Sequence, residues 1–335
     1  MRALMLSLAA AALALAQESK GLQIRWIDVE GGAATLVVTP EGESLLMDCG
    51  WPGKRDAERI AAAARAAGVS KIDHYLTSHW HTDHVGGVPD LVQAIPVAHF
   101  YDHGFPDGDP KDVVPKEKEG YLKASEGRRT VLKPGDTVPL KGASVKILCA
   151  HAVVVGEAAG SPQVRACDVH PMNPEVKEDT SDNARSIGFL LEWKGFKFVD
   201  NGDLTWNVEH KLICPKNLVG TADVYQVTHH GLHISNHPAL LEALQPTVAV
   251  INNGAKKGGM PATYQRLRDL PSIKDIYQVH RNVMTGAKDN APAEFIANDD
   301  AECQGEGIVL TVDPSGKTYT VEVPSKKTRR SYSVK

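Results

Sequence analysis

The segment 78–87 gathers four side chains that are able to bind metal ions. It reads SHWHTDHVGG and places His79, His81, Asp83 and His84 within six positions. Imidazole and carboxylate groups are rarely crowded together for packing reasons, because each must be hydrogen-bonded or solvated. Both are ligands that zinc and similar ions take at about 2.0–2.2 Å. The HxHxDH spacing therefore predicts a metal loop that can hold two ions side by side, and the two glycines that follow allow a tight turn.

Apolar strands and amphipathic helices must position this loop. The run 72–78 predicts a buried strand that leads directly into it, and a helix start is expected at 85–88. Further strands are predicted at 22–29, 33–39, 44–48, 97–101, 144–150, 186–193, 196–200, 222–228, 247–252 and 275–279, and helices at 54–67, 238–244 and 263–269. The stretch 102–135 is polar and rich in Gly, Pro and Lys, without a readable pattern. Strand runs with helices between them predict an α/β class of two sheets face to face with helices outside.

Bulk composition narrows the function classes. The formal net charge is −4 at pH 7, which gives no global attraction to nucleic acid or anionic lipid. No P-loop, GxSxG or GxGxxG motif competes with the histidine loop for the chemistry. The five cysteines lack CxxC spacing, so neither a zinc ribbon nor a disulfide framework is indicated. One or two disulfide bridges are possible, and a bridge between Cys149 and Cys167 would close the shortest loop among them.

The two ends of the chain read differently from its middle. Residues 1–16 have a basic second residue, an apolar run and an Ala-Leu-Ala ending, which is the layout of a secretory signal peptide. We therefore expect an exported protein, periplasmic or extracellular, without stable membrane insertion after cleavage. Residues 21–323 are expected to form the functional domain, and 324–335 a basic C-terminal tail.

With these features in place, the sequence resembles the metallo-β-lactamase-fold hydrolases over about 22–323. The resemblance implies a four-layer αββα sandwich with a metal site at one edge of the sheets. Asp48 matches the acidic residue of the family's first motif, and the HxHxDH loop matches the second. His151 matches the third, with His170 as the alternative, and Asp203 matches the fourth. The fifth is His230, with His229 as the second choice.

Within this superfamily, two segments are similar to the hydrolase domain of ComEC-type competence proteins. They are SDNARSIGFLLEWKGFKFVDNGD and QVTHHGLHISNHPALLEALQPTVAVINNG. One departure is the second histidine of HxHxDH, where ComEC-type loops commonly have aspartate. This chain also lacks the ComEC membrane channel, so the resemblance does not transfer DNA uptake to it.

The resemblance implies a two-metal centre with a hydroxide between the ions. His79, His81 and His151 would hold the first ion, Asp83, His84 and His230 the second, and Asp203 would bridge them. Asp48 and Asp83 are the catalytic carboxylates, with Asp48 fixing the orientation of the ligands. Zinc is the expected metal, with manganese and iron as alternatives. A metal-activated water would then be the nucleophile at neutral pH.

The expected activity is hydrolysis of a phosphodiester. The acidic balance disfavours long nucleic acid, so a small or envelope-derived phosphodiester is expected instead. Alternatives are an ester, lactone or β-lactam substrate, and iron-dependent oxidation on the same fold, although no flavin domain or rubredoxin-type CxxC is present. The candidate substrate-binding residues are Asn183, His229, Lys256, Lys257 and His280.

Overall fold

A computed structural model describes residues 21–105, 108, 110–158, 160–172, 177–303 and 305–335. The proposed signal peptide lies outside these described residues. Within them, no helix is both long enough and apolar enough to cross a membrane.

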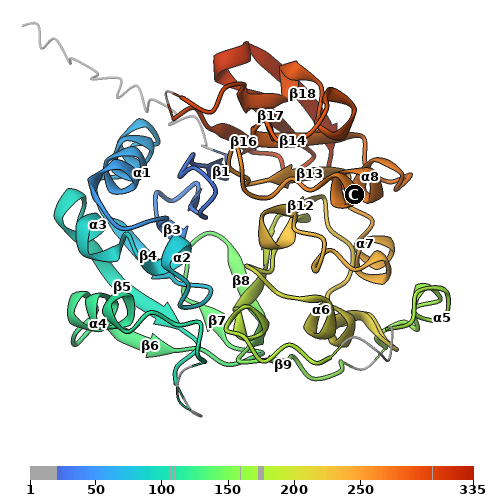
Figure 1. Cartoon of the computed structure of the whole chain (residues 1–335), viewed down its shortest axis with the longest axis horizontal. Coiled ribbons are helices and arrows are strands. Elements are labelled where there is room, and N and C mark those ends of the chain that lie inside the picture. The colour runs from blue at the N-terminus through green and yellow to red at the C-terminus, as the bar shows by residue number, and fades with distance from the viewer. Residues whose placement is uncertain (1–20, 106–107, 109, 159, 173–176, 304) are drawn as a thin grey trace, which may run out of the picture.

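Two mixed sheets form the centre of the molecule (Figure 1). The first has the order β18-β17-β16-β1-β2-β3-β4-β5-β6. Its strands are β1 (Gln23–Trp26), β2 (Thr35–Val38), β3 (Ser44–Met47), β4 (Ile72–Leu76), β5 (Val97–Asp102), β6 (Arg129–Val131), β16 (Ile308–Val312), β17 (Thr318–Val323) and β18 (Thr328–Ser333). The second has the order β15-β14-β13-β12-β11-β10-β8-β7, with β9 paired to β8. Its strands are β7 (Thr137–Val138), β8 (Ser144–Ala150), β9 (Val153–Val154), β10 (Gly188–Trp193), β11 (Phe196–Asp200), β12 (Val224–Gln226), β13 (Val248–Ile251), β14 (Asp275–His280) and β15 (Ile296–Asn298).

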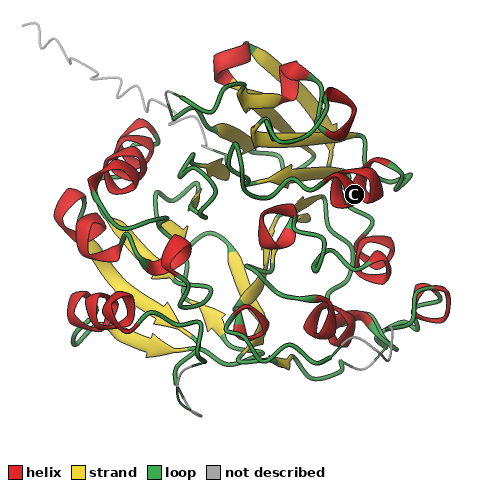
Figure 2. Cartoon of the chain, in the orientation of Figure 1, coloured by secondary structure: helices red, strands yellow, loops and turns green. Residues whose placement is uncertain are grey.

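Helices cover the outer face of each sheet (Figure 2). On the first sheet these are α1 (Lys54–Ala66), α3 (Val88–Ala94) and α4 (Pro115–Ala124), and α2 (Thr82–Val85) carries part of the metal loop. The helices of the second half are α5 (Ala166–Val169), α6 (Trp206–Ile213), α7 (Pro238–Leu244) and α8 (Pro261–Arg268). Short 3-10 turns are η1 (Asn183–Arg185), η2 (Thr228–Gly231), η3 (Ala287–Asp289), η4 (Ala293–Phe295) and η5 (Pro324–Lys326). The expected αββα layering is confirmed.

Alternating side chains in the strands build the layers. In β3, Leu45 and Met47 face the core between the two sheets, whereas Leu46 faces the core beneath α1 and α3. This follows from the two-residue period of a strand, which sends successive side chains to opposite faces. Both faces of the strand are therefore apolar, as its continuous run of hydrophobic residues requires.

A buried glutamine joins the two sheets close to the site described below. Gln226 Oε1 in β12 accepts hydrogen bonds from Trp26 Nε1 at 2.8 Å and from Thr35 Oγ1 at 2.7 Å, both in the first sheet. A buried amide oxygen keeps both hydrogen bonds in only one relative placement of its two donors, and losing either bond in the interior is costly. The contact therefore fixes how the two sheets are placed relative to each other.

Parallel pairing brings the chemically important loops to one edge of the sandwich. Strands β3, β4 and β5 run parallel, and so do β11 through β15. The loops that leave parallel strands at their carboxyl ends lie together, as in other α/β sheets. Asp48, the histidine loop, Asp203 and His230 all follow strands of these two sets.

Several features differ from the sequence expectations, among them the unpredicted α6, β15, β16 and β17. Three further differences bear on particular predictions. The polar stretch 102–135 contains α4, whose Tyr121 is fully buried. The expected basic tail instead includes β18, which pairs antiparallel with β17. In β18 Tyr332 is buried in the core, whereas Arg329 and Arg330 are exposed. The disulfide joins Cys167 to Cys214 rather than to Cys149, which is buried as a free thiol.

Candidate metal centre

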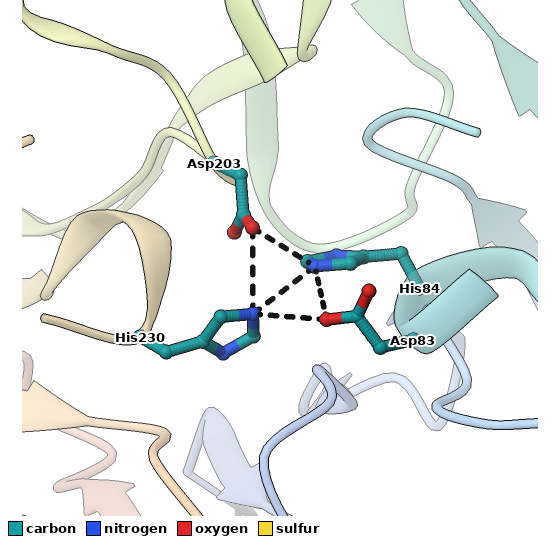
Figure 3. Close-up of side chains that lie close together, drawn as sticks. All are labelled: Asp83, His84, Asp203 and His230. Atoms are coloured by element: carbon teal, nitrogen blue, oxygen red, sulfur yellow. Dashed lines mark hydrogen bonds and ion pairs between the residues drawn. The ribbon is translucent and has the colours of Figure 1, made fainter. Parts of the chain in front are cut away.

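Four side chains of metal-ligand type from three separate segments converge at the edge of the sandwich (Figure 3). Asp83 and His84 lie in α2, Asp203 follows β11, and His230 lies in η2 after β12. Each offers one ligand atom, and these atoms all lie within 4.8 Å of one another. All four residues are buried. The segments come from both halves of the chain, so only the folded sandwich assembles the group.

The contacts within this group are those of a ligand cluster. Asp203 Oδ2 lies 3.2 Å from His84 Nε2 and 3.4 Å from His230 Nε2. Asp83 Oδ2 lies 3.3 Å from each of the same two nitrogens. The two Nε2 atoms are themselves 3.2 Å apart. Two carboxylate oxygens and two imidazole nitrogens thus face a common centre.

In each ring, the hydrogen bond of the nitrogen that faces away from the cluster indicates which ring nitrogen carries the proton. His84 Nδ1 donates to Asp48 Oδ2 at 2.8 Å, and His230 Nδ1 donates to the carbonyl oxygen of Asn252 at 3.1 Å. We assign the neutral rings from this network, with the proton on Nδ1. With both rings neutral, the two Nε2 atoms would present lone pairs to each other at 3.2 Å, and such a contact needs either a proton or a metal ion between them. The donor set therefore fits a metal ion, with the second ring nitrogen held as metal-binding histidines usually have it.

His79 adds a further bare nitrogen beside the cluster. Ser78 Oγ donates to Asp48 Oδ2 at 2.7 Å, so it accepts from His79 Nδ1 at 2.9 Å. His79 Nε2 is buried without a hydrogen-bond partner and lies 4.0 Å from Asp203 Oδ2. A buried nitrogen with no partner is costly unless something binds it. Asp203 Oδ2 accordingly lies within 4.0 Å of the Nε2 atoms of His79, His84 and His230.

Charge at the centre favours cations. Burial would raise the pKa of Asp203, but His230, His84 and His229 around it hold that pKa well below its usual range. Burial would lower the pKa of His84, yet Asp203, Asp83 and Asp48 raise it well above the ordinary value. The buried carboxylates thus attract a positive charge, whether a proton or a metal ion, to this position.

The backbone at the cluster is unusual. His229 and His230 both adopt left-handed conformations, with φ of 57° and 51°, and Asp48 has φ of 61°. Such conformations are uncommon outside glycine and concentrate at functional sites. Asn236 Nδ2 donates to the carbonyl oxygen of Thr228 at 3.0 Å and so holds the turn. Gly86 and Gly87 have ordinary helical φ values; a Cβ on Gly87 would meet the Cys49 carbonyl oxygen at 2.3 Å, so close approach is what they permit.

His229 borders the cluster without joining it. Its Nε2 lies 3.5 Å from Asp203 Oδ2 and 3.5 Å from Asn183 Nδ2. Ser235 Oγ donates to the Leu204 carbonyl oxygen at 2.6 Å and therefore accepts from His229 Nδ1 at 3.0 Å. Burial lowers the pKa of His229 to about 4. Its ring is thus neutral, with the Nε2 lone pair turned toward Asp203 and Asn183.

The candidates for the first ion are placed differently. His81 lies beside His79, with ring centroids 4.6 Å apart, and its Nε2 bonds Asp112 Oδ2 at 2.7 Å. His151 follows β8 with φ of 53°, and its backbone N–H donates to the Arg185 carbonyl oxygen. His170 instead bonds Glu242 Oε1 at 2.8 Å and lines a cavity with residues of α7 and α8.

The two lysines separate clearly. Lys257 forms an ion pair with Asp83 Oδ2 and lies over the ring of Trp51, 5.3 Å from its centroid. Lys256 is exposed and has no such contact with the cluster. Sequence reasoning gave both the same role, because it had no means of telling which of two adjacent loop residues turns inward.

His280 lies in a different group. It is fully buried, and its Nε2 bonds Asp28 Oδ1 at 2.7 Å. Asp28, His280 and Cys303 form a second set of ligand-type residues within the described chain. The Arg59 guanidinium lies 3.1 Å from Asp28 Oδ2, so a cation already balances this carboxylate. A buried histidine in this arrangement is not placed to contact a substrate.

Sequence reasoning missed the residues that hold the ligands. Ser78 and Asn252 bond the outer nitrogens of His79 and His230, and Asp112 bonds His81. Ser78 could have been found, since it lies directly beside the histidine loop. Asn252 acts through its backbone oxygen, and Asp112 lies in a stretch without a pattern, so neither left a readable signal.

Comparison with known proteins finds a family match over the first part of the chain. Residues 27–187 match the family model described as the metallo-beta-lactamase superfamily. The chain is 26% identical over 235 residues to Recombination protein 2 of Haemophilus influenzae, covering 69% of this chain and 24% of that protein. It is 25% identical over 191 residues to ComE operon protein 3 of Bacillus subtilis, covering 56% of this chain and 21% of that protein. The chain thus spans about a quarter or less of these relatives' length.

Among solved structures, the metallo-beta-lactamase fold protein YhfI from Bacillus subtilis is similar to this chain. The match has a TM-score of 0.41 and 12% sequence identity, and it covers 69% of this chain and 85% of that one.

Proposed function

This chain carries a metallo-beta-lactamase superfamily domain with a His/Asp metal site, and we propose on that basis that it is an exported hydrolase that uses two divalent metal ions to cleave a phosphodiester. The single observation that carries the proposal is the convergence of three buried histidine Nε2 atoms around the Asp203 carboxylate. His84 and His230 present theirs to each other, and His79 presents its own 4.0 Å from Asp203 Oδ2.

Two groups of residues would hold the ions. His79, His81 and His151 would hold the first, and Asp83, His84 and His230 the second, with Asp203 between them. Zinc suits imidazole and carboxylate ligands in this mixture, and manganese or iron would accept them too. When bound, such ions supply an activated water at neutral pH, and their positive charge stabilises the negative charge that develops in the transition state.

The residues around the centre would orient the ligands and the substrate. Asp48 accepts hydrogen bonds from His84 Nδ1 and Ser78 Oγ, so it fixes two ligands of different ions at once. His229 Nε2 is a hydrogen-bond acceptor close to Asp203, suited to take a proton from water or from a substrate hydroxyl. Asn183 Nδ2 is a donor on the same side, and it could hold a substrate oxygen.

A phosphodiester is proposed because the centre's surroundings favour an anion once metal is bound. Lys257 brings an ammonium group to Asp83, and a metal ion at Asp83 would free that group for a phosphate oxygen. Relatives named for recombination and for the ComE operon point in the same direction. The formal charge of −4 still favours a small substrate over a long nucleic acid.

The test joins metal content with substrate choice. We expect the metal-loaded protein to hold about two equivalents of zinc or manganese and to hydrolyse bis(p-nitrophenyl) phosphate faster than p-nitrophenyl acetate, p-nitrophenyl phosphate or nitrocefin. Asp203→Ala should lose metal and reduce kcat/KM about 100-fold or more, since it removes a ligand rather than a ligand's support. His170→Ala is the matched control, a histidine outside the cluster, and should keep both.

Three results would contradict parts of this proposal. Well under one equivalent of metal after loading would remove the metal centre. Preference for the ester or for nitrocefin would keep the centre and replace the substrate. Loss of metal in His170→Ala but not in His151→Ala would reverse the assignment of the third ligand of the first ion.

A further inference from the structure

Asp112 contacts the histidine loop from a segment that is remote in sequence. Its Oδ2 lies 2.7 Å from His81 Nε2, and the side chain of His81 is largely buried. No other described carboxylate is paired with His81. The contact therefore links the loop after β5 to the metal centre.

His81 is held through the opposite nitrogen from the other ring ligands. His79, His84 and His230 each donate from Nδ1, to a hydroxyl, a carboxylate and a carbonyl respectively, and each turns Nε2 toward Asp203. An imidazole that gives one nitrogen to a carboxylate keeps the other for a metal, because the neutral ring carries a single proton. In His81 the proton lies on Nε2, which faces Asp112, so Nδ1 is the nitrogen left to bind a metal ion.

Asp112 is itself held in place by the backbone of Asp182, a residue that also contacts the histidine loop. Asp112 Oδ2 accepts a hydrogen bond from the backbone N–H of Asp182 at 3.1 Å. Asp182 Oδ2 in turn accepts from the backbone N–H of Trp80, in the histidine loop, at 2.6 Å. Asp182 is fully buried and adjoins Asn183. Three segments are thereby tied together around His81, which keeps the Asp112 carboxylate from moving freely.

We propose that Asp112 is a positioning residue that selects the Nδ1 coordination of the first metal ion by His81. The inference rests on the proposed metal function and deepens it. Asp112 donates no atom to the metal; it fixes the ring's tautomer and orientation and increases the basicity of the nitrogen that binds. Because a third of its side chain is exposed, the residue can be replaced without opening the core.

The test compares Asp112→Ala with Asp136→Ala, an exposed loop aspartate whose described side-chain contact is the backbone N–H of Lys133. Metal affinity is measured by competition with a chelator on the full chain. Asp112→Ala should bind one of the two ions about 10- to 100-fold more weakly, the usual cost of losing such a partner. Asp136→Ala should match the unmodified protein.

Nitrogen-15 NMR of the zinc-loaded protein supplies the readout that a merely structural role would not move. In the unmodified protein, one metal-bound histidine, assigned through His81→Gln, should show a protonated Nε2 and a metal-bound Nδ1. The other metal-bound histidines should show the reverse pattern. In Asp112→Ala the His81 signal should become a mixture of both tautomers.

Two outcomes would overturn the inference while leaving the proposed function intact. One is a His81 that binds through Nε2 in the unmodified protein. The other is a Co²⁺-loaded Asp112→Ala whose visible absorption rises several-fold, because a lower coordination number would make Asp112 a direct ligand. An unmodified protein that binds no metal would instead contradict the proposed function itself.

Discussion

At the scale of single residues, the centre depends on which nitrogen of each histidine is occupied from outside. The Nδ1 atoms of the three rings donate hydrogen bonds outward: His84 to Asp48, His79 to Ser78, and His230 to the backbone oxygen of Asn252. The ligand atoms therefore face inward before any ion arrives, so little reorganisation is needed on binding. Such preorganisation is what distinguishes a metal site from a chance cluster of histidines.

We expect the positive charge of Lys257 to strengthen the binding of an anionic substrate. We expect Lys257→Ala to raise KM for a phosphodiester roughly fivefold, in line with about 1 kcal/mol for a partly exposed charge contact. The effect should be larger at low salt, because ions screen exposed charges. Lys256→Ala is the control, since that neighbouring side chain is exposed. Equal changes in KM for bis(p-nitrophenyl) phosphate and for neutral p-nitrophenyl acetate would show that Lys257 does not act on substrate charge.

At the scale of elements, α6 supports the left-handed turn that carries His230. Glu209 in α6 is fully buried and accepts from the backbone N–H groups of Asn236 at 2.9 Å and His237 at 2.8 Å. Asn236 then holds Thr228, at the start of η2. The proposed metal ligand His230 is thus positioned by a helix that contributes no residue to the cluster.

Glu209 should make stability depend on pH. Burial raises the pKa of Glu209 to about 7, above the ordinary value of 4.5. The folded protein therefore keeps a proton that the unfolded chain has already lost between these two values. It follows that this residue's contribution is fully present below about pH 4.5 and is lost as pH rises through about 7.

The measurement is the free energy of urea unfolding of the metal-free protein at several pH values. Glu209→Gln cannot titrate, so it should show a shallower fall in stability between pH 4.5 and 7 than the unmodified protein. Glu58→Gln serves as control, because that carboxyl is exposed in α1. Identical pH profiles for Glu209→Gln and the unmodified protein would contradict this assignment.

At the scale of the whole molecule, one covalent link joins the loop around α5 to the end of α6. Cys167 and Cys214 are 47 residues apart in sequence and form the disulfide found among the described residues. A crosslink of this span is expected to stabilise the fold by about 2–4 kcal/mol, mainly by restricting the unfolded chain. We expect Cys167→Ser to lower Tm by several degrees without changing metal content, because the link lies outside the centre.

The comparison is made by thermal unfolding with and without reductant. Cys303→Ser is the control, a free and partly exposed cysteine. Reductant should lower the Tm of the unmodified protein and of Cys303→Ser, and leave Cys167→Ser unchanged. A Tm that does not respond to reductant in any of the three would mean that the disulfide contributes nothing measurable.

The sequence by itself determined the class of fold and the ligand loop. Alternating and continuous apolar runs set which segments are strands, and HxHxDH is local, so its residues are neighbours whatever the rest of the chain does. The predicted strands before the loop, at 72–78, and around 196–200 lie where β4 and β11 are found. Among the elements that were not predicted, α4 and β18 have few apolar residues, and tertiary packing decides such elements. The strands β16 and β17 were also missed, although their apolar residues are more numerous.

Tertiary structure alone decided which remote residues complete the centre. His229 and His230 are adjacent in sequence and both rings lie within 3.5 Å of Asp203, but the left-handed turn of η2 brings only His230 to Asp83. Lys257 rather than Lys256 turns inward for the same kind of reason. Asp112 could not be found at all from the sequence, since a single exposed aspartate in an irregular loop has no pattern until the chain folds and brings it to His81. Long-range contacts of this sort depend on the packing of two sheets and are not encoded in any local spacing.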